Sequence, residues 1–247
     1  DADWDAGDIR YNVLRWIAAP SPQFSGYGPS FANPRTGQIL GADVMLEFSS
    51  LRRYQEVENI YDSSKLFAVS DNGHQGLYRQ LAFGLSALMA MGADARQQSV
   101  MVDDWLRSLV VHEVGHTLGL NHNFRASQYR PLSQLHDSVE THKSGLSGSV
   151  MDYEATNVAP PGQPQGQYWS TVPGPYDDWA IDYGYSEALA DPVAEAARLQ
   201  AILGRSTEPQ LAFGNDADDM RAPGAGIDPR VMTFDMSSDA IGFAEQR

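Results

Sequence analysis

Three histidines and one glutamate lie close together in the segment VVHEVGHTLGLNHNF, residues 110–124. His112 and His116 are four residues apart, a spacing that places both imidazoles on one face of a helix. Two nitrogen ligands at that spacing can share one zinc ion. Glu113 follows the first of these histidines, and a carboxylate there can act as the general base on a metal-activated water molecule.

The third histidine can join the other two only if the chain leaves the helix sharply. Gly119 allows such a turn because it has no Cβ atom, and glycine is a common residue at the end of a helix. We expect the turn to bring His122 back as a third ligand, with the fourth position left for water. An amphipathic helix with surface histidines is the alternative for H-E-x-x-H alone, but the longer pattern favours a zinc site.

The complete pattern H-E-x-x-H-x-x-G-x-x-H resembles that of the metzincin zinc endopeptidases at every fixed position. Metzincins also carry a methionine turn downstream, and the segment SGSVMDY, residues 147–153, is similar to it. The resemblance implies that Met151 forms an apolar floor under the imidazoles without binding the metal. Tyr153 stands two residues later, as in astacins and serralysins, which implies a role in stabilising the oxyanion. The alternative is a buried core tyrosine.

A narrower resemblance connects the chain to pappalysins and, more closely, to a bacterial family of large reprolysin-like zinc-dependent metalloproteases. Besides HEVGHTLGLNHNF and SVMDY, it rests on four segments: RYNVLRW, GYGPSFANPRTGQILGADV, GPYDDWAIDYGY and DPRVMTFDMSSDAI. Asn123 follows the third histidine, where astacins have glutamate, matrixins serine, reprolysins aspartate and serralysins proline. Members of the bacterial family are long, multidomain and exported. The resemblance therefore implies a bacterial periplasmic, cell-surface or secreted protein that binds its substrate extended along a sheet edge.

Composition excludes several classes of function. The formal net charge is −15, so phosphate backbones would be repelled and we expect no nucleic-acid partner. The absence of cysteine excludes disulfides, cysteine nucleophiles and thiolate metal ligands. No apolar run reaches the roughly 18 residues of a membrane span, so we expect no transmembrane helix. The segment DADWDAGD at the start has no initiator methionine and no signal-peptide pattern, so we expect a processed form or an excised piece.

The elements that must position the histidines are predicted from periodicity and turn residues. Three segments rich in β-branched and aromatic residues are predicted as strands: 8–18, 39–48 and 65–70. Periodic apolar residues predict helices at about 76–91, 103–119, 176–183 and 192–203. Proline, glycine and polar residues predict loops at 19–38, 121–149 and 157–177. Residues 49–64 are predicted as a short helix or helical turn.

We therefore predict an α+β chain with a metzincin-like zincin fold, in which a twisted mixed sheet lies beside a central active-site helix. Residues 1–120 are expected to form the N-terminal lobe of the catalytic domain. Its first strand and first long helix would lie upstream of Asp1 if residues 39–48 correspond to the third metzincin strand. Residues 121–247 are expected to form a mainly helical and irregular C-terminal lobe with the third zinc ligand and the methionine turn.

The predicted function is a zinc-dependent endopeptidase that acts on a peptide or protein substrate, with Glu113 as general base. Two alternatives stay open: a zinc-bearing binding module without turnover, and a zinc hydrolase with a non-peptide substrate. The sequence does not determine the oligomeric state.

The remaining histidines, His74, His136 and His142, lie in polar contexts without paired spacing and are predicted to be surface residues. The segments DADWDAGD and GNDADDM resemble calcium loops only superficially. In the first, the glycine falls one position late and no glutamate closes the loop at position twelve.

Overall fold

A computed structural model describes residues 5–19, 24–47, 73–219 and 228–247 of the chain. The predicted strand at 65–70 and the predicted helical segment at 49–64 lie outside these residues. The chain divides into two compact units, Asp1–Asn121 and His122–Arg247.

The first unit contains a mixed sheet built around one long strand, β4 (Ile39–Glu47). Strand β1 (Val13–Ile17) lies parallel to it, with Val13 opposite Asp43. Strands β2 (Gly26–Tyr27) and β3 (Ser30–Ala32) lie antiparallel to β4 on its other side. The predicted mixed sheet is confirmed in the described residues.

Two strand predictions need correction. The loop prediction for residues 19–38 was wrong in part, because β2 and β3 form there. The glycine, serine and proline residues in and between these strands have low strand propensity, and pairing with β4 overrides it. Strand β1 also starts later than residue 8, since Asp8 and Tyr11 donate backbone hydrogen bonds to the carbonyls of Asp5 and Asp8 and form turns.

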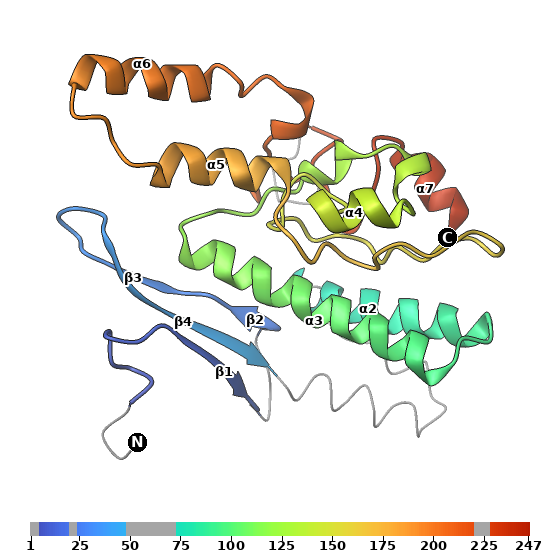
Figure 1. Ribbon diagram of the computed structural model, residues 1–247. Helices are drawn as coiled ribbons and strands as arrows, with labels where there is room; N and C mark the ends of the chain where they lie inside the picture. The colour runs from blue at the N-terminus through green and yellow to red at the C-terminus, as the bar shows by residue number, and fades with distance from the viewer. Residues whose placement is uncertain (1–4, 20–23, 48–72, 220–227) are drawn as a thin grey trace. The chain divides into compact units, whose positions relative to one another are not determined.

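Two helices complete the first unit: α2 (Gly73–Ala90) and α3 (Ala95–Thr117). They lie side by side, and α3 also contacts β4 and β2 (Figure 1). Their contact is apolar, with the rings of Tyr78 and Trp105 5.1 Å apart. The core residues of these elements are Val44, Leu46, Leu81, Leu85, Leu88, Met101, Trp105 and Leu109.

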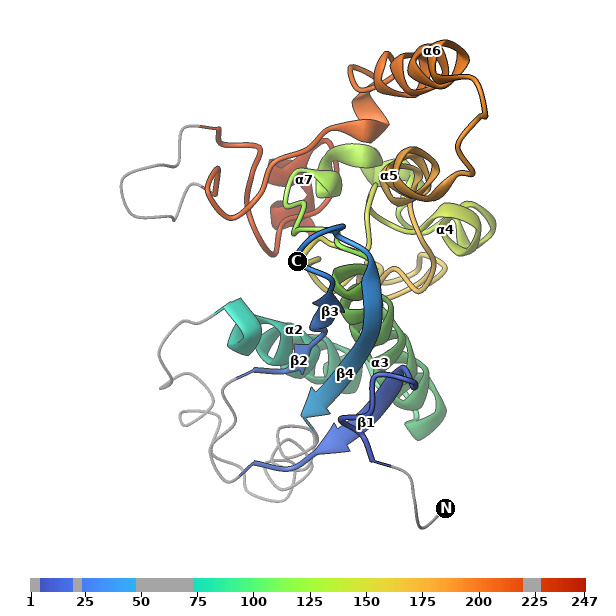
Figure 2. The same ribbon diagram turned by 90° about the vertical axis from the view of Figure 1, so that its left-hand side faces the viewer.

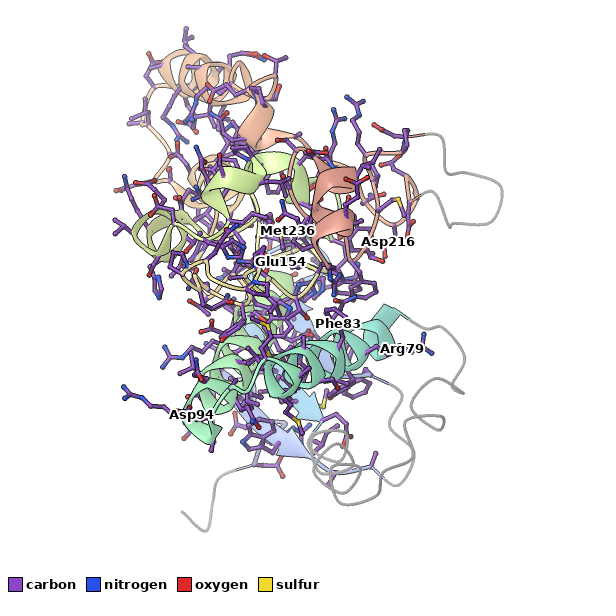
Figure 3. The ribbon with its side chains drawn as sticks, turned by 90° about the vertical axis from the view of Figure 1, so that its right-hand side faces the viewer. Arg79, Phe83, Asp94, Glu154, Asp216 and Met236 are labelled. Carbon is purple, nitrogen blue, oxygen red and sulfur yellow. The ribbon has the colours of Figure 1, made fainter. Side chains whose placement is uncertain are left out.

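The start of α3 was predicted too late, at about Asp103. The helix begins after Asp94, whose carboxylate accepts a hydrogen bond from the Gln97 backbone at 2.9 Å (Figure 3). The Gln97 side chain accepts one from the Asp94 backbone at 3.0 Å in return. This capping box satisfies two backbone donors that the helix itself cannot.

The second unit combines short helices with irregular chain. Its α-helices are α4 (Ser138–Ser144), α5 (Pro175–Tyr185), α6 (Pro192–Leu203) and α7 (Ala240–Gln246). Its 3-10 helices are η2 (Ala126–Tyr129), η3 (Leu132–Gln134) and η4 (Pro209–Leu211). The loop prediction for residues 121–149 was therefore wrong where η2, η3 and α4 form. The helix predicted at residues 192–203 has the same first and last residues as α6.

Two groups of contacts hold this unit together. Helices α5 and α6 are neighbours (Figure 2), and the Trp179 indole donates a hydrogen bond to the Ile202 carbonyl at 2.8 Å. One buried hydrophobic cluster consists of Leu135, Leu146, Ala155, Met236 and Phe243. In the described residues the chain is thus mixed α+β, and none of their helices is long and apolar enough to cross a membrane.

Candidate metal centre

Helix α3 ends in the two turns that carry the first two histidines. His112 is buried and His116 partly buried, and their rings meet edge to face with centroids 4.8 Å apart. The predicted placement of both imidazoles on one helix face is confirmed.

The end of α3 is a Schellman motif built on Gly119. This residue has a φ of +90°, which favours glycine because a Cβ atom would be strained there. The backbone of Gly119 donates to the His116 carbonyl at 2.9 Å, and that of Leu120 donates to the Gly115 carbonyl at 3.1 Å. The sharp turn predicted at this glycine is confirmed.

The turn brings the three predicted ligands together. The ligand atoms of His112, His116 and His122 all lie within 4.8 Å of one another. Tetrahedral zinc with Zn–N bonds of about 2.0–2.1 Å would separate its nitrogen ligands by about 3.3 Å. Modest rotation of the rings would therefore let all three bind a single ion.

Outer hydrogen bonds orient two of these rings. The Nδ1 atom of His116 lies 3.0 Å from the Leu120 carbonyl oxygen, and Nδ1 of His122 lies 2.9 and 3.0 Å from the Asp216 carboxylate oxygens. Carbonyl and ionised carboxylate oxygens only accept, so Nδ1 carries a proton, and in the neutral imidazole Nε2 then holds the lone pair. Metal-binding histidines usually have this arrangement. The histidine cluster thus fits a metal ion.

Asp216, labelled in Figure 3, was missed in the sequence. It is two-thirds exposed and lies 94 residues after His122, in a segment that we considered only as a poor calcium loop. No local periodicity connects the two residues. Asn123 holds the two regions together, because its amide donates to the Ala212 carbonyl at 3.0 Å and accepts from the Gly214 backbone at 3.1 Å.

Glu113 lies buried against β2 within the first unit. A Cβ atom on Gly26 would come within 2.2 Å of its carboxylate, and one on Gly28 within 2.1 Å of its backbone oxygen. Position 28 therefore requires glycine, whereas a side chain at position 26 would displace the Glu113 carboxylate. Burial raises the pKa of the Glu113 carboxyl to about 8, and a hydrogen bond from the Gly28 backbone offsets part of that rise. Such a carboxyl can exchange a proton near neutral pH.

The chain turns at Val150 and Met151, and the Met151 side chain is fully buried. Its carbonyl accepts a hydrogen bond from the Asn123 backbone at 3.0 Å, next to the third histidine. The expected position of Met151 under the imidazoles stays a prediction.

Asp177, at the start of α5, anchors this turn. Its carboxylate accepts hydrogen bonds from the Ser149 hydroxyl at 2.5 Å and from the backbones of Val150 and Gly174 at 2.8 Å each. Burial raises the pKa of Asp177, although these hydrogen bonds lower it in part. This residue was not predicted from the sequence.

Tyr153 is buried in an aromatic cluster of the second unit. Its ring centroid lies 4.7 Å from that of His122, 5.2 Å from Phe124 and 6.1 Å from Phe234. The contact with His122 is compatible with a role at the metal, and the burial is compatible with a core residue. The two alternatives therefore remain.

The other histidines lie outside this cluster or outside the described side chains. His142 is exposed as predicted, whereas His136 is partly buried, which lowers its pKa. The His74 side chain lies outside the described residues.

Comparison with known proteins gives one match. A family model described as Met-zincin matches residues 94–247, which is more than half of the chain and includes the three histidines, Glu113 and the methionine turn. No curated protein and no solved structure matches the chain.

Proposed function

The chain belongs to the Met-zincin family, and on this basis we propose that it is a zinc-dependent endopeptidase. The observation that carries the proposal is the cluster of three histidines whose ligand atoms lie within 4.8 Å of one another, with a buried glutamate on the same helix. His112, His116 and His122 would hold the ion. Bound zinc would supply a Lewis acid that polarises the scissile carbonyl and makes a water molecule more acidic.

Glu113 is proposed as the general base. Its carboxylate accepts the proton of the attacking water and then returns it to the leaving amine. Its raised pKa supports this role, because a base is most effective when its pKa lies near the working pH. Gly26 lies close against the Glu113 side chain, and the Gly28 backbone donates a hydrogen bond to the carboxylate, so the position of the side chain is restricted.

Tyr153 is proposed as the hydrogen-bond donor to the oxyanion. Its ring packs against that of His122, which supports a place near the reacting carbonyl. One such donor typically contributes about 10²–10³ in turnover.

A peptide or protein is the proposed substrate, bound as an extended strand. β2 and β3 form the outer side of the described sheet beyond β4, and Tyr27 of β2 is exposed. An outer strand next to Glu113 is a suitable place for a peptide to add by backbone hydrogen bonds.

We further propose that the chain belongs to the bacterial reprolysin-like group that also resembles pappalysins, and that it is exported. Asn123 supports a group separate from astacins, matrixins, reprolysins and serralysins, which have other residues after the third histidine. Here both ends of the Asn123 amide make hydrogen bonds. Residues 1–120 and 121–247 would be the two lobes of the catalytic domain, and the division of the chain after Asn121 supports this.

A digest of a fluorogenic peptide library tests the proposal. We expect cleavage by the zinc-loaded protein, loss of cleavage after metal removal, and recovery when zinc returns. A protein that binds zinc and cleaves no peptide would be a binding module or a hydrolase of another substrate. A parallel assay with ester and amide substrates would separate those two outcomes.

A further inference from the structure

Three segments of the second unit meet beside the methionine turn. The Ser127 backbone in η2 donates a hydrogen bond to Asp152 Oδ2 at 2.6 Å. The backbones of Phe234 and Ala155 donate to the carbonyls of Tyr153 at 2.7 Å and of Asp235 at 3.4 Å. This pairing brings Asp235 next to the turn. Glu154 and Met236, which adjoin the paired residues in the sequence, are labelled in Figure 3.

Three side-chain oxygens at this meeting point are buried and have no hydrogen-bond partner within 3.5 Å: Ser127 Oγ, Asp152 Oδ1 and Asp235 Oδ1. Ser127 is fully buried and Asp152 is 6% exposed. The second oxygen of each carboxylate does have a partner, which is the Ser127 backbone for Asp152 and the Gln128 amide, at 3.4 Å, for Asp235. A buried oxygen without a partner costs about 1–3 kcal/mol, so three of them together require an explanation.

The carboxylates of this site repel one another, and burial adds to the cost of their charge. Burial raises the pKa of Asp152 well above its usual value, and the charges of Asp235 and Glu154 raise it further. Burial likewise raises the pKa of Asp235 to about 6, while the nearby Ser127 hydroxyl favours its ionised form. In the part of the chain that the structure describes, neither Asp152 nor Asp235 is paired with a basic side chain. Buried carboxylates are costly unless a cation or a proton compensates them.

We propose that Ser127 Oγ, Asp152 Oδ1 and Asp235 Oδ1 bind a calcium ion. All three donors are oxygens, the ligand type that this hard cation takes, whereas the histidine cluster offers only nitrogen. Two carboxylates would neutralise the ion, and backbone carbonyls or water would complete the six to eight ligands that calcium binds.

The ion would connect three parts of the second unit that are distant in the sequence. Ser127 follows the third histidine by five residues, Asp152 lies between Met151 and Tyr153, and Asp235 belongs to the C-terminal segment. Because the donors come together only in the folded chain, binding would add directly to the free energy of unfolding.

The competing explanation is one proton shared between Asp152 and Asp235. A shared proton predicts no effect of calcium at any concentration. It also predicts that an asparagine at position 235, which can donate a hydrogen bond, replaces the proton without loss.

Thermal melts of the zinc-loaded protein with and without calcium test the proposal. The buffer is freed of calcium and keeps a small excess of zinc, so that the histidine cluster stays loaded. At a calcium concentration of about 100 times Kd, we expect the Tm of the wild type to rise by about 5–10 °C. Equilibrium dialysis should find one bound calcium per chain at unchanged zinc content.

The variants are Asp235→Asn and Ser127→Ala, with Asp178→Asn as the control. Asp178 is an exposed carboxylate on α5, so its variant should respond like the wild type. Asp235→Asn should lose the calcium-dependent rise, and Ser127→Ala should need more calcium for the same rise. Ser127→Ala also provides the answer if Asp235→Asn does not fold. A wild type with no calcium-dependent rise, or an equal rise in Asp235→Asn, would overturn the proposal and leave the zinc assignment untouched.

Discussion

The anchoring of the methionine turn by Asp177 gives a prediction whose magnitude follows from the structure. The Asp177→Ala substitution removes the acceptor of three hydrogen bonds and leaves the donors on Ser149, Val150 and Gly174 without it. Each buried donor left without a partner costs about 1–3 kcal/mol. Burial already destabilises the ionised carboxylate, which offsets part of the loss, so we expect a decrease of about 3–5 kcal/mol in the free energy of unfolding.

The matched variant is Asp177→Asn. Its amide oxygen can still accept from the Val150 and Gly174 backbones, and its NH₂ group can face the Ser149 hydroxyl, which also accepts hydrogen bonds. We expect this variant to lose less than about 1 kcal/mol. Urea unfolding followed by circular dichroism measures both values. Equal losses in the two variants would refute the anchoring role, because they would show that the acceptor does not matter.

Three further predictions concern residues around the candidate site. Asp216→Asn should weaken zinc binding about tenfold in a competition titration, because it replaces the carboxylate that orients the His122 ring. An unchanged zinc affinity would show that Asp216 does not support the metal site through His122. Tyr153→Phe should lower kcat about 10²–10³-fold at full zinc occupancy and nearly unchanged KM, and a kcat within about threefold of wild type would identify a core residue. In calcium-free buffer, the contribution of Asp235 to stability should be present below its unfolded pKa near 3.8 and lost as the pH rises through its folded pKa of about 6. The free energy of unfolding of Asp235→Asn, measured by urea unfolding, should therefore increase by about 1–3 kcal/mol relative to that of the wild type between pH 4 and pH 7. A difference between the two proteins that does not change with pH would contradict the raised pKa.

Local patterns predicted the parts of the site that short-range geometry controls. The spacing of His112 and His116 follows from the helix period, and the glycine that ends α3 brings His122 back to the other two histidines. The capping box at Asp94 was also visible as D-A-R-Q and was overlooked in favour of the apolar residues further along.

Contacts between residues far apart in the sequence could not be predicted from such local patterns. β2 and β3 form in a segment rich in glycine and proline because β4 is available as a partner. Asp216 reaches His122 over 94 residues, and Asp177 reaches Ser149 over 28. A single carboxylate has no periodicity, so only its partners in the folded chain identify it.

The most direct test of the proposed peptidase is kcat/KM of zinc-loaded Glu113→Gln on the best peptide from the library. The amide keeps the size of the side chain next to Gly26 and removes only its ability to take up a proton. We expect one zinc per chain, as in the wild type, and a fall in kcat/KM of about 10²–10⁴-fold. A variant that retains zinc and cleaves the peptide at the wild-type rate would contradict the account.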